Sequence, residues 1–167
     1  MREAVAATAL AGLGWSPEQE KAVDRVAASG RASTLGLQIW KARYMLESKA
    51  YQDAIKGLTA HYLKTYKAER PDMARRLVEE ILSEFMGPSC TTCNGARELI
   101  EEELRVTCHA CQGSGLRVYS DVERATRMKL SLQHTRLLTR KMGWLMGELG
   151  AMDRTVNTII SYELEKC

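Results

Sequence analysis

Apolar residues recur at helical spacing along the first half of the chain. Residues 33–69 contain no proline, and their apolar side chains mostly follow one another at steps of three to five residues. This spacing predicts helix, because it places them on one face. The positions are Leu35, Ile39, Tyr44, Leu46, Tyr51, Ile55, Leu58, Tyr62 and Tyr66. Gly57 is the expected break within this segment.

Two further helices are predicted by their end signals. Ser16 is suited to an N-cap, Pro17 to the first helical position and Gly30 to the stop, which predicts a helix between them. Pro71 starts another helix, whose apolar stripe is Met73, Leu77, Ile81 and Phe85. Residues 1–16 are expected to be poorly ordered or to form a short helix.

The C-terminal residues predict a pair of helices after a shorter helix that Ser120 caps. The first apolar face consists of Leu137, Leu138, Met142, Leu145 and Leu149. Gly150 is expected to break the helix, and Asp153 to cap a final helix with the inner face Val156, Ile159, Ile160 and Leu164. Two amphipathic helices joined by a short glycine-containing turn resemble a helix-turn-helix.

A helix-turn-helix presents the outward residues near the start of its second helix to the DNA major groove. Here those residues are Arg154, Thr155, Asn157 and Thr158. Arginine can pair with guanine and asparagine with adenine, whereas Arg136, Arg140 and Lys141 would contact phosphates. Any antiparallel helix hairpin shows the same pattern, so simple packing is the alternative.

Charge is distributed unevenly on a chain whose formal net charge is only +3. Residues 124–141 contain six basic residues and no acidic one: Arg124, Arg127, Lys129, Arg136, Arg140 and Lys141. Glutamates instead gather at positions 98 and 101–103. A local basic segment attracts phosphate, and a solvated helix face is the alternative interpretation.

Four of the five cysteines form two Cys-x-x-Cys pairs, Cys90 with Cys93 and Cys108 with Cys111. Two intervening residues let a tight turn direct both sulfurs to one point, and the fourteen residues between the pairs suffice for a hairpin. Glycines follow each pair and permit positive φ. The pattern predicts one tetrahedral Zn²⁺ per chain, in a closed site that folds a module and does no chemistry.

Three other interpretations of the cysteines are weaker. Disulfides suit exported chains, and the N-terminal residues lack the apolar core of a signal peptide. A thioredoxin-like site needs one pair in an α/β fold, and iron–sulfur clusters use other spacings. His109 is expected to be an exposed spacer, and Cys167 an unpaired thiol.

The chain of 167 residues is therefore predicted to be mainly α. The expected architecture is a helical bundle with an inserted four-cysteine zinc-binding module and a C-terminal helix-turn-helix-like pair. The expected regions are 1–87 (helical), 88–117 (zinc module) and 118–167 (helical, DNA-binding). No apolar run approaches the roughly 18 residues of a membrane span, so we expect a cytoplasmic protein without membrane contact.

The stretch "FMGPSCTTCNGARELIEEELRVTCHACQGSGLRVYS" resembles the late-gene antitermination protein Q family of lambdoid bacteriophages. An apolar helix leads through a proline into the first Cys-x-x-Cys turn with its following glycine, which we call the first knuckle. An acidic and apolar excursion follows. The second Cys-x-x-Cys turn with its glycines, the second knuckle, then leads into a helix. The terminal "MGELGAMDRTVNTII" is similar to the family's closing helices in placement. The resemblance covers roughly residues 75–165. Ala96 stands near where a second glycine is common.

The resemblance implies a factor that binds double-stranded DNA near a late promoter and loads onto host RNA polymerase with its sigma factor. The modified polymerase then passes terminators. Cys90, Cys93, Cys108 and Cys111 would hold the zinc, residues 154, 155, 157 and 158 would face DNA, and the basic stretch from Arg124 to Lys141 would contact phosphates or polymerase. The alternatives are a zinc-containing DNA-binding regulator that does not travel with polymerase, and an enzyme or assembly factor braced by the module. An enzyme is not expected, because the sequence has no catalytic constellation.

Overall fold

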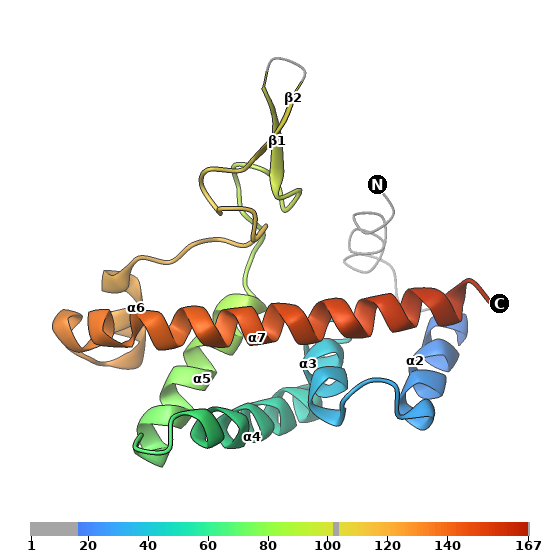
Figure 1. The fold of residues 1–167 in the computed structure, drawn as a ribbon, viewed down its shortest axis with the longest axis horizontal. Coiled ribbons are helices and arrows are strands. Elements are labelled where there is room, and N and C mark those ends of the chain that lie inside the picture. The colour runs from blue at the N-terminus through green and yellow to red at the C-terminus, as the bar shows by residue number, and fades with distance from the viewer. Residues whose placement is uncertain (1–16, 102–103, 167) are drawn as a thin grey trace. The chain divides into compact units, whose positions relative to one another are not determined.

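The computed structural model describes residues 17–101 and 104–166, and its fold is mainly helical, as predicted (Figure 1). The predictions for residues 1–16, for Ser16 as a cap and for Cys167 lie outside this part. The elements are α2 (Pro17–Ser29), α3 (Thr34–Tyr44), α4 (Ser48–Thr65), α5 (Pro71–Phe85), β1 (Glu98–Glu101), β2 (Leu104–Thr107), α6 (Asp121–Met128) and α7 (Leu132–Leu164).

The chain divides into two compact units that do not follow the three predicted consecutive regions. Among the described residues, the first unit comprises 17–75 together with 145–166, and the second lies between Arg76 and Trp144. The cysteine module, which we define as residues 88–117, lies wholly within the second unit. Among the described helices, none has the length and apolarity needed to cross a bilayer.

The break in the predicted 33–69 helical segment lies at Leu46, and the expected break at Gly57 is wrong. Leu46 has a φ of 53° between α3 and α4, whereas Gly57 lies inside α4. A Cβ at Gly57 would lie 2.7 Å from Cδ1 of Leu35. The glycine is therefore explained by the close approach of α3 to α4, for which only a hydrogen atom leaves room.

The core of the first unit joins the N-terminal helices to the end of the chain. Val23 and Val26 of α2 and Trp40 of α3 form one buried cluster with Val156 and Ile160 of α7. The apolar face predicted for the last residues is thus a core face. Burying such side chains contributes about 1.5–3 kcal/mol each and fixes the C-terminal half of α7 in its unit.

The predicted helix-turn-helix is wrong, because α7 continues through Gly150 as one helix of 33 residues. Glycine inside a helix costs about 1 kcal/mol. Buried residues on both sides of Gly150 offset that cost, since Leu145, Leu149 and Val156 are all 1% exposed or less. Asp153, the predicted cap, is itself buried and paired to Arg43 at 2.9 Å.

Candidate metal centre

The four cysteines of the two pairs converge on one buried point, as the spacing predicted. Their sulfur atoms all lie within 4.8 Å of one another, and all four residues are buried. The Sγ atoms of Cys90 and Cys108 are 4.0 Å apart, and those of Cys93 and Cys111 are 3.7 Å apart. Each of these contacts joins one pair to the other.

These separations suit a bound metal ion. A tetrahedron of sulfurs at a zinc–sulfur distance of about 2.3 Å has edges of about 3.8 Å, close to both measured contacts. Disulfide bonds need sulfurs about 2.05 Å apart, and the four thiols are free. The donor set therefore fits one metal ion, and four thiolates favour a soft or borderline ion.

The two halves of the module are related by a pseudo-two-fold arrangement. The N–H of Cys90 donates to the carbonyl of Gly115 at 2.8 Å, and the N–H of Cys108 donates to the carbonyl of Arg97 at 2.9 Å. Within each half, the N–H three residues after the second cysteine donates to that cysteine's carbonyl, at 2.8 Å from Ala96 and 3.0 Å from Ser114. Each knuckle thus closes itself and also anchors the first cysteine of the other.

Positive φ angles recur at matching positions of the two knuckles. Asn94 and Gly95 match Gln112 and Gly113, with φ values of 49°, 82°, 50° and 79°. Arg97 (φ 69°) matches Gly115 (φ 75°). The place of the expected second glycine in the first knuckle is therefore Arg97, not Ala96, and this arginine adopts a conformation that costs a side-chain residue roughly 1–2 kcal/mol.

Backbone N–H groups stabilise the thiolate forms of two of the four cysteines, Cys90 and Cys111. Hydrogen bonds from the N–H groups of Cys93 and Thr92 lower the pKa of the Cys90 thiol to about 6. Burial raises the pKa of the Cys93 thiol to about 11. At Cys111, burial opposes ionisation, but N–H donation from Gly115, at 3.3 Å, and from Gly113 leaves the pKa lowered. Thiolates are the form that binds a metal.

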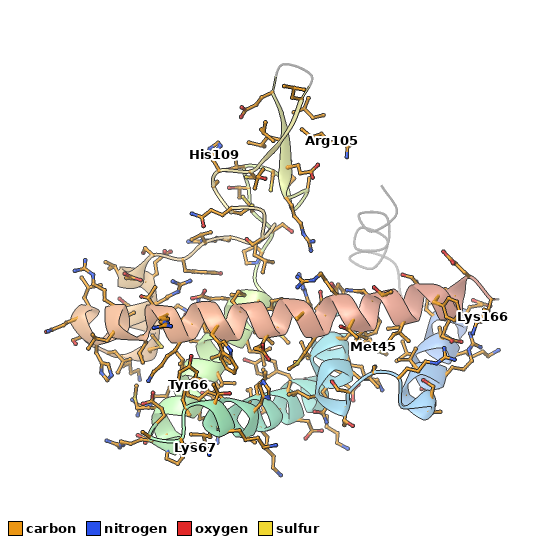
Figure 2. The ribbon with its side chains drawn as sticks, in the orientation of Figure 1. Met45, Tyr66, Lys67, Arg105, His109 and Lys166 are labelled. Atoms are coloured by element: carbon orange, nitrogen blue, oxygen red, sulfur yellow. The ribbon has the colours of Figure 1, made fainter. Side chains whose placement is uncertain are left out.

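The excursion between the pairs forms an antiparallel hairpin, for which its length is sufficient. Leu99 is opposite Val106 and Ile100 is opposite Arg105. Leu99 packs against the cysteine cluster, which ties the hairpin to the centre. His109 is exposed between the second pair of cysteines, as expected of a spacer (Figure 2).

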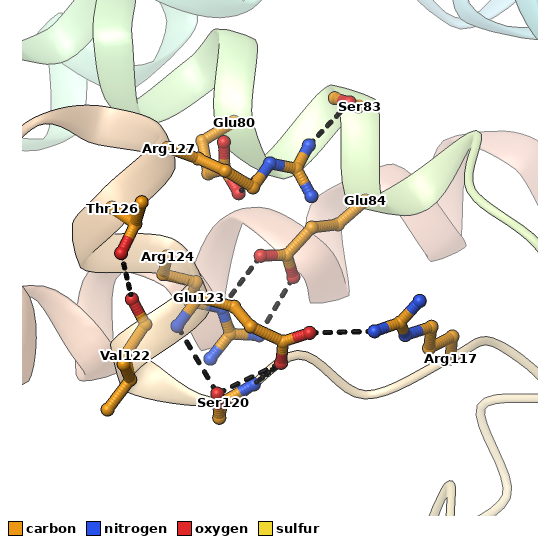
Figure 3. A network of polar contacts seen from close by, with 10 residues as sticks. All are labelled: Glu80, Ser83, Glu84, Arg117, Ser120, Val122, Glu123, Arg124, Thr126 and Arg127. Carbon is orange, nitrogen blue, oxygen red and sulfur yellow. Dashed lines mark hydrogen bonds and ion pairs between the residues drawn. The ribbon is translucent and has the colours of Figure 1, made fainter.

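A network of arginines and glutamates attaches the module's exit to the helices of the second unit (Figure 3). Arg124 holds Glu84 of α5 through two hydrogen bonds of 2.7 and 2.8 Å. Arg127 lies 3.1 Å from Glu80 and donates to Ser83 at 2.9 Å. Glu84 is 2% exposed and Glu80 is 7% exposed, so both carboxylates depend on these arginines.

The start of α6 is fixed by the predicted cap and by the chain leaving the module. Ser120 and Glu123 form a capping box, in which the side chain of Ser120 accepts from the N–H of Glu123. Glu123 also accepts from Arg117 at 2.7 Å. The Arg117 and Arg127 guanidinium groups lie 4.8 and 4.9 Å from the centre of the Tyr119 ring.

Two of the arginines predicted to contact phosphate, Arg124 and Arg127, therefore form internal ion pairs. The side chain of Arg124 is 16% exposed and that of Arg127 is 35% exposed, each against a buried glutamate. Withdrawing either arginine to bind a phosphate would leave a buried carboxylate unpaired, so the predicted DNA contacts of both residues compete with these internal ion pairs. The sequence analysis did not predict that Glu80 and Glu84 would be buried partners of these arginines. Their spacing of four residues, on an otherwise apolar helix face, could have indicated it.

The other predicted basic contacts lie on the first part of α7. Arg136 and Arg140 are exposed, and Lys141 is half-buried. Arg136 makes a long contact of 3.9 Å with Asp121, while its side chain remains 68% exposed. The helical spacing brings Arg136 and Arg140 together on one side of α7, because they are four residues apart, and it places Lys141 on another side.

The four residues predicted to read bases separate into two faces of α7. Arg154, Thr155 and Thr158 are exposed. Asn157 points inward instead, where its Oδ1 accepts from Trp40 Nε1 at 2.8 Å, so its predicted outward role is wrong. The two threonine hydroxyls donate to carbonyls of their own helix, from Thr155 to Ala151 and from Thr158 to Arg154, each at 3.0 Å.

A second buried polar group fixes α3 to α7 in the first unit. Arg43 and the hydroxyl of Tyr44 donate to Asp153 Oδ2 at 2.9 and 3.1 Å. Burial, followed by the nearby charge of Asp153, raises the pKa of Tyr44. The sequence signal was present but misinterpreted, since an aspartate suits an N-cap and a buried ion pair equally well.

Comparison with known proteins gives no match: no family model fits the chain, and neither a curated protein nor a solved structure resembles it significantly.

Proposed function

We propose that the four-cysteine centre binds one Zn²⁺ and that its role is structural. Four thiolates in near-tetrahedral spacing are a common zinc ligand set, and four protein ligands leave no open position for substrate. Each pair of cysteines holds one knuckle, so the ion would join the two halves of the module. The module alone would then perform no chemistry, and function would reside in the surfaces around it.

We further propose that the protein is a transcription antitermination factor similar to the Q proteins of lambdoid bacteriophages. The observation that carries this proposal is the convergence of the four sulfur atoms, which all lie within 4.8 Å of one another. The elements around them follow one another in the order on which the resemblance rests. Helix α5 leads into the first knuckle, the hairpin separates the knuckles, and the second leads into α6. The factor would bind late-promoter DNA and RNA polymerase with its sigma factor, and would travel with the enzyme past terminators.

Two separate sets of exposed residues are offered as DNA contacts. In the first unit these are Arg154, Thr155 and Thr158, of which Arg154 has the donors to read a base edge or bind a phosphate. In the second unit they are Arg136 and Arg140, together with the half-buried Lys141, which would contribute sequence-independent phosphate contacts. Asn157, Arg124 and Arg127 have internal partners and are not included.

The deciding experiment is transcription in vitro with purified polymerase holoenzyme, on a template carrying the factor's own late promoter followed by a terminator. The full chain should raise readthrough, and a Cys90→Ser, Cys93→Ser variant should not. Equal readthrough with and without the protein would refute antitermination. Specific DNA binding without increased readthrough would favour a zinc-containing regulator that does not travel with polymerase.

A further inference from the structure

Helix α4 of the first unit has a buried apolar face and, opposite it, a face with exposed lysines. The buried residues are Ala50, Ala54, Ile55, Leu58 and Tyr62. Lys49, Lys56 and Lys64 are exposed. At about 3.6 residues per turn, these three lysines lie within about 80° of one another around the helix axis and span about 22 Å along it. They therefore form one basic stripe, which we call the α4 stripe.

The lysines of the α4 stripe are not used by the fold. In the part of the chain that the structure describes, none of the three forms an ion pair with a carboxylate. The helix contains one acidic residue, the half-buried Asp53. By contrast, Arg43 and Arg124 are each paired to a buried carboxylate. The positive charge of the stripe is therefore available to an anionic partner.

The apolar residues of α4 decide which anionic partner fits the stripe. None of its large apolar side chains is exposed, because Leu63 is half-buried and the others face the core. A stable protein interface is held by apolar or aromatic anchors. A basic helix that binds a membrane inserts an apolar face, and α4 has committed that face to the core. Neither partner matches a surface whose exposed groups are charges.

The phosphate backbone of a nucleic acid needs positive charge alone. Duplex DNA carries one negative charge per about 1.7 Å of its axis. A duplex lying along the stripe, which spans about 22 Å, would therefore offer a phosphate to each of the three lysines. Binding would release the counterions that these phosphates hold in free DNA.

We propose that the α4 stripe binds the phosphate backbone of double-stranded DNA without regard to sequence. Lysine carries its charge at one point on a flexible stem, so these contacts would position a duplex rather than read its bases. The stripe is distinct from the residues of α7 offered above as DNA contacts. The proposal goes beyond antitermination and does not rest on it, because it needs neither a late promoter nor polymerase.

The test is fluorescence anisotropy of the full, zinc-loaded chain with a labelled duplex that lacks any late-promoter sequence, at several salt concentrations. The variant carrying Lys49→Ala, Lys56→Ala and Lys64→Ala should bind more weakly. The slope of its logarithmic affinity against logarithmic salt concentration should become shallower by about 0.9 for each lysine. Its unfolding temperature should not fall, because the lysines are exposed and alanine favours helix. Arginine at the same three positions should retain the wild-type slope.

A matched control removes the same three charges from elsewhere in the first unit. It carries Lys21→Ala, Arg70→Ala and Lys166→Ala, all at exposed positions. Arg70 and Lys166 already pair with Asp72 and Glu163. This variant should keep the wild-type slope, which would show that the position of the lysines matters and not the net charge.

The proposal would be overturned if the wild-type chain did not bind the promoter-free duplex, or if the alanine variant of the stripe kept the wild-type slope. It would also be overturned if the control lost as much binding as that variant. Vesicles containing phosphatidylserine are tested in parallel, and a variant that lost binding to vesicles but not to the duplex would assign the stripe to a membrane instead. The assay contains neither promoter nor polymerase, so its failure is distinguishable from a failure of antitermination.

Discussion

Arg97 and Gly115 occupy equivalent positions at the ends of the two knuckles, each with positive φ and each accepting a hydrogen bond from the first cysteine of the other pair. Glycine adopts this conformation without strain, and arginine does not. Arg97→Gly should therefore stabilise the metal-loaded chain by about 1 kcal/mol, measured by thermal unfolding. Part of the gain is offset by the greater freedom of glycine in the unfolded chain.

Two neighbouring substitutions provide controls for Arg97→Gly. Gly115→Ala should destabilise, because its Cβ would lie 2.9 Å from the carbonyl oxygen of Gly95 at a φ of 75°. Ala96→Gly should not stabilise, since Ala96 is not among the positive-φ positions. A stabilising Ala96→Gly together with a neutral Arg97→Gly would contradict the assignment.

The sequence predicted the local features that depend on neighbouring residues. The start of α5 at Pro71, the cap at Ser120 and the convergence of the cysteine pairs all follow from short-range chemistry. The features it did not predict depend on distant partners. Gly57 leaves room inside α4 for the side chain of Leu35, rather than breaking the helix. Asn157 points inward because its side chain accepts a hydrogen bond from Trp40. Arg124 points to α5 because that helix supplies Glu84 as its partner.

Metal removal should destabilise the cysteine module selectively. Elemental analysis is expected to find one zinc per chain, and chelation should increase amide hydrogen exchange in residues 88–117. Cys108→Ser should reproduce the effect, whereas His109→Ala should retain the zinc, because His109 is exposed. A chelated protein with unchanged exchange in this segment would show that no metal contributes to its fold.

Arg124→Ala should be among the most destabilising substitutions of an arginine in this chain. It would leave Glu84, which is 2% exposed, as an uncompensated buried carboxylate, at a cost of about 3–5 kcal/mol. Arg140→Ala should change the free energy of unfolding by no more than about 0.5 kcal/mol, because Arg140 is exposed. Replacing both partners, Arg124→Met with Glu84→Leu, should recover most of the loss. Equal effects of the two alanine variants in denaturant unfolding would contradict the buried pair.

Arg154 and Asn157 should separate DNA binding from stability. Arg154→Ala should leave the unfolding temperature unchanged but weaken specific DNA binding, by about 1–3 kcal/mol if the side chain contacts a base. Asn157→Ala should instead destabilise the fold by about 1–3 kcal/mol, because Trp40 Nε1 would lose its acceptor. Fluorescence anisotropy with a late-promoter duplex and thermal unfolding measure the two effects. An Asn157→Ala protein of normal stability that no longer binds DNA would restore this residue to the reading surface.

Gly147 and Gly150 test whether α7 is one helix in solution. A Cβ at Gly147 would have no heavy atom within 4 Å, and at Gly150 it would meet only the flexible end of Arg154 at 3.2 Å. In a continuous helix, alanine at either position should therefore stabilise the first unit by about 0.5–1 kcal/mol. In a helix-turn-helix, a glycine at the turn would have a positive φ, so Gly150→Ala would destabilise the protein while Gly147→Ala still stabilised it. Denaturant unfolding of the two variants separates these outcomes, because only the sign of the Gly150→Ala effect differs between them.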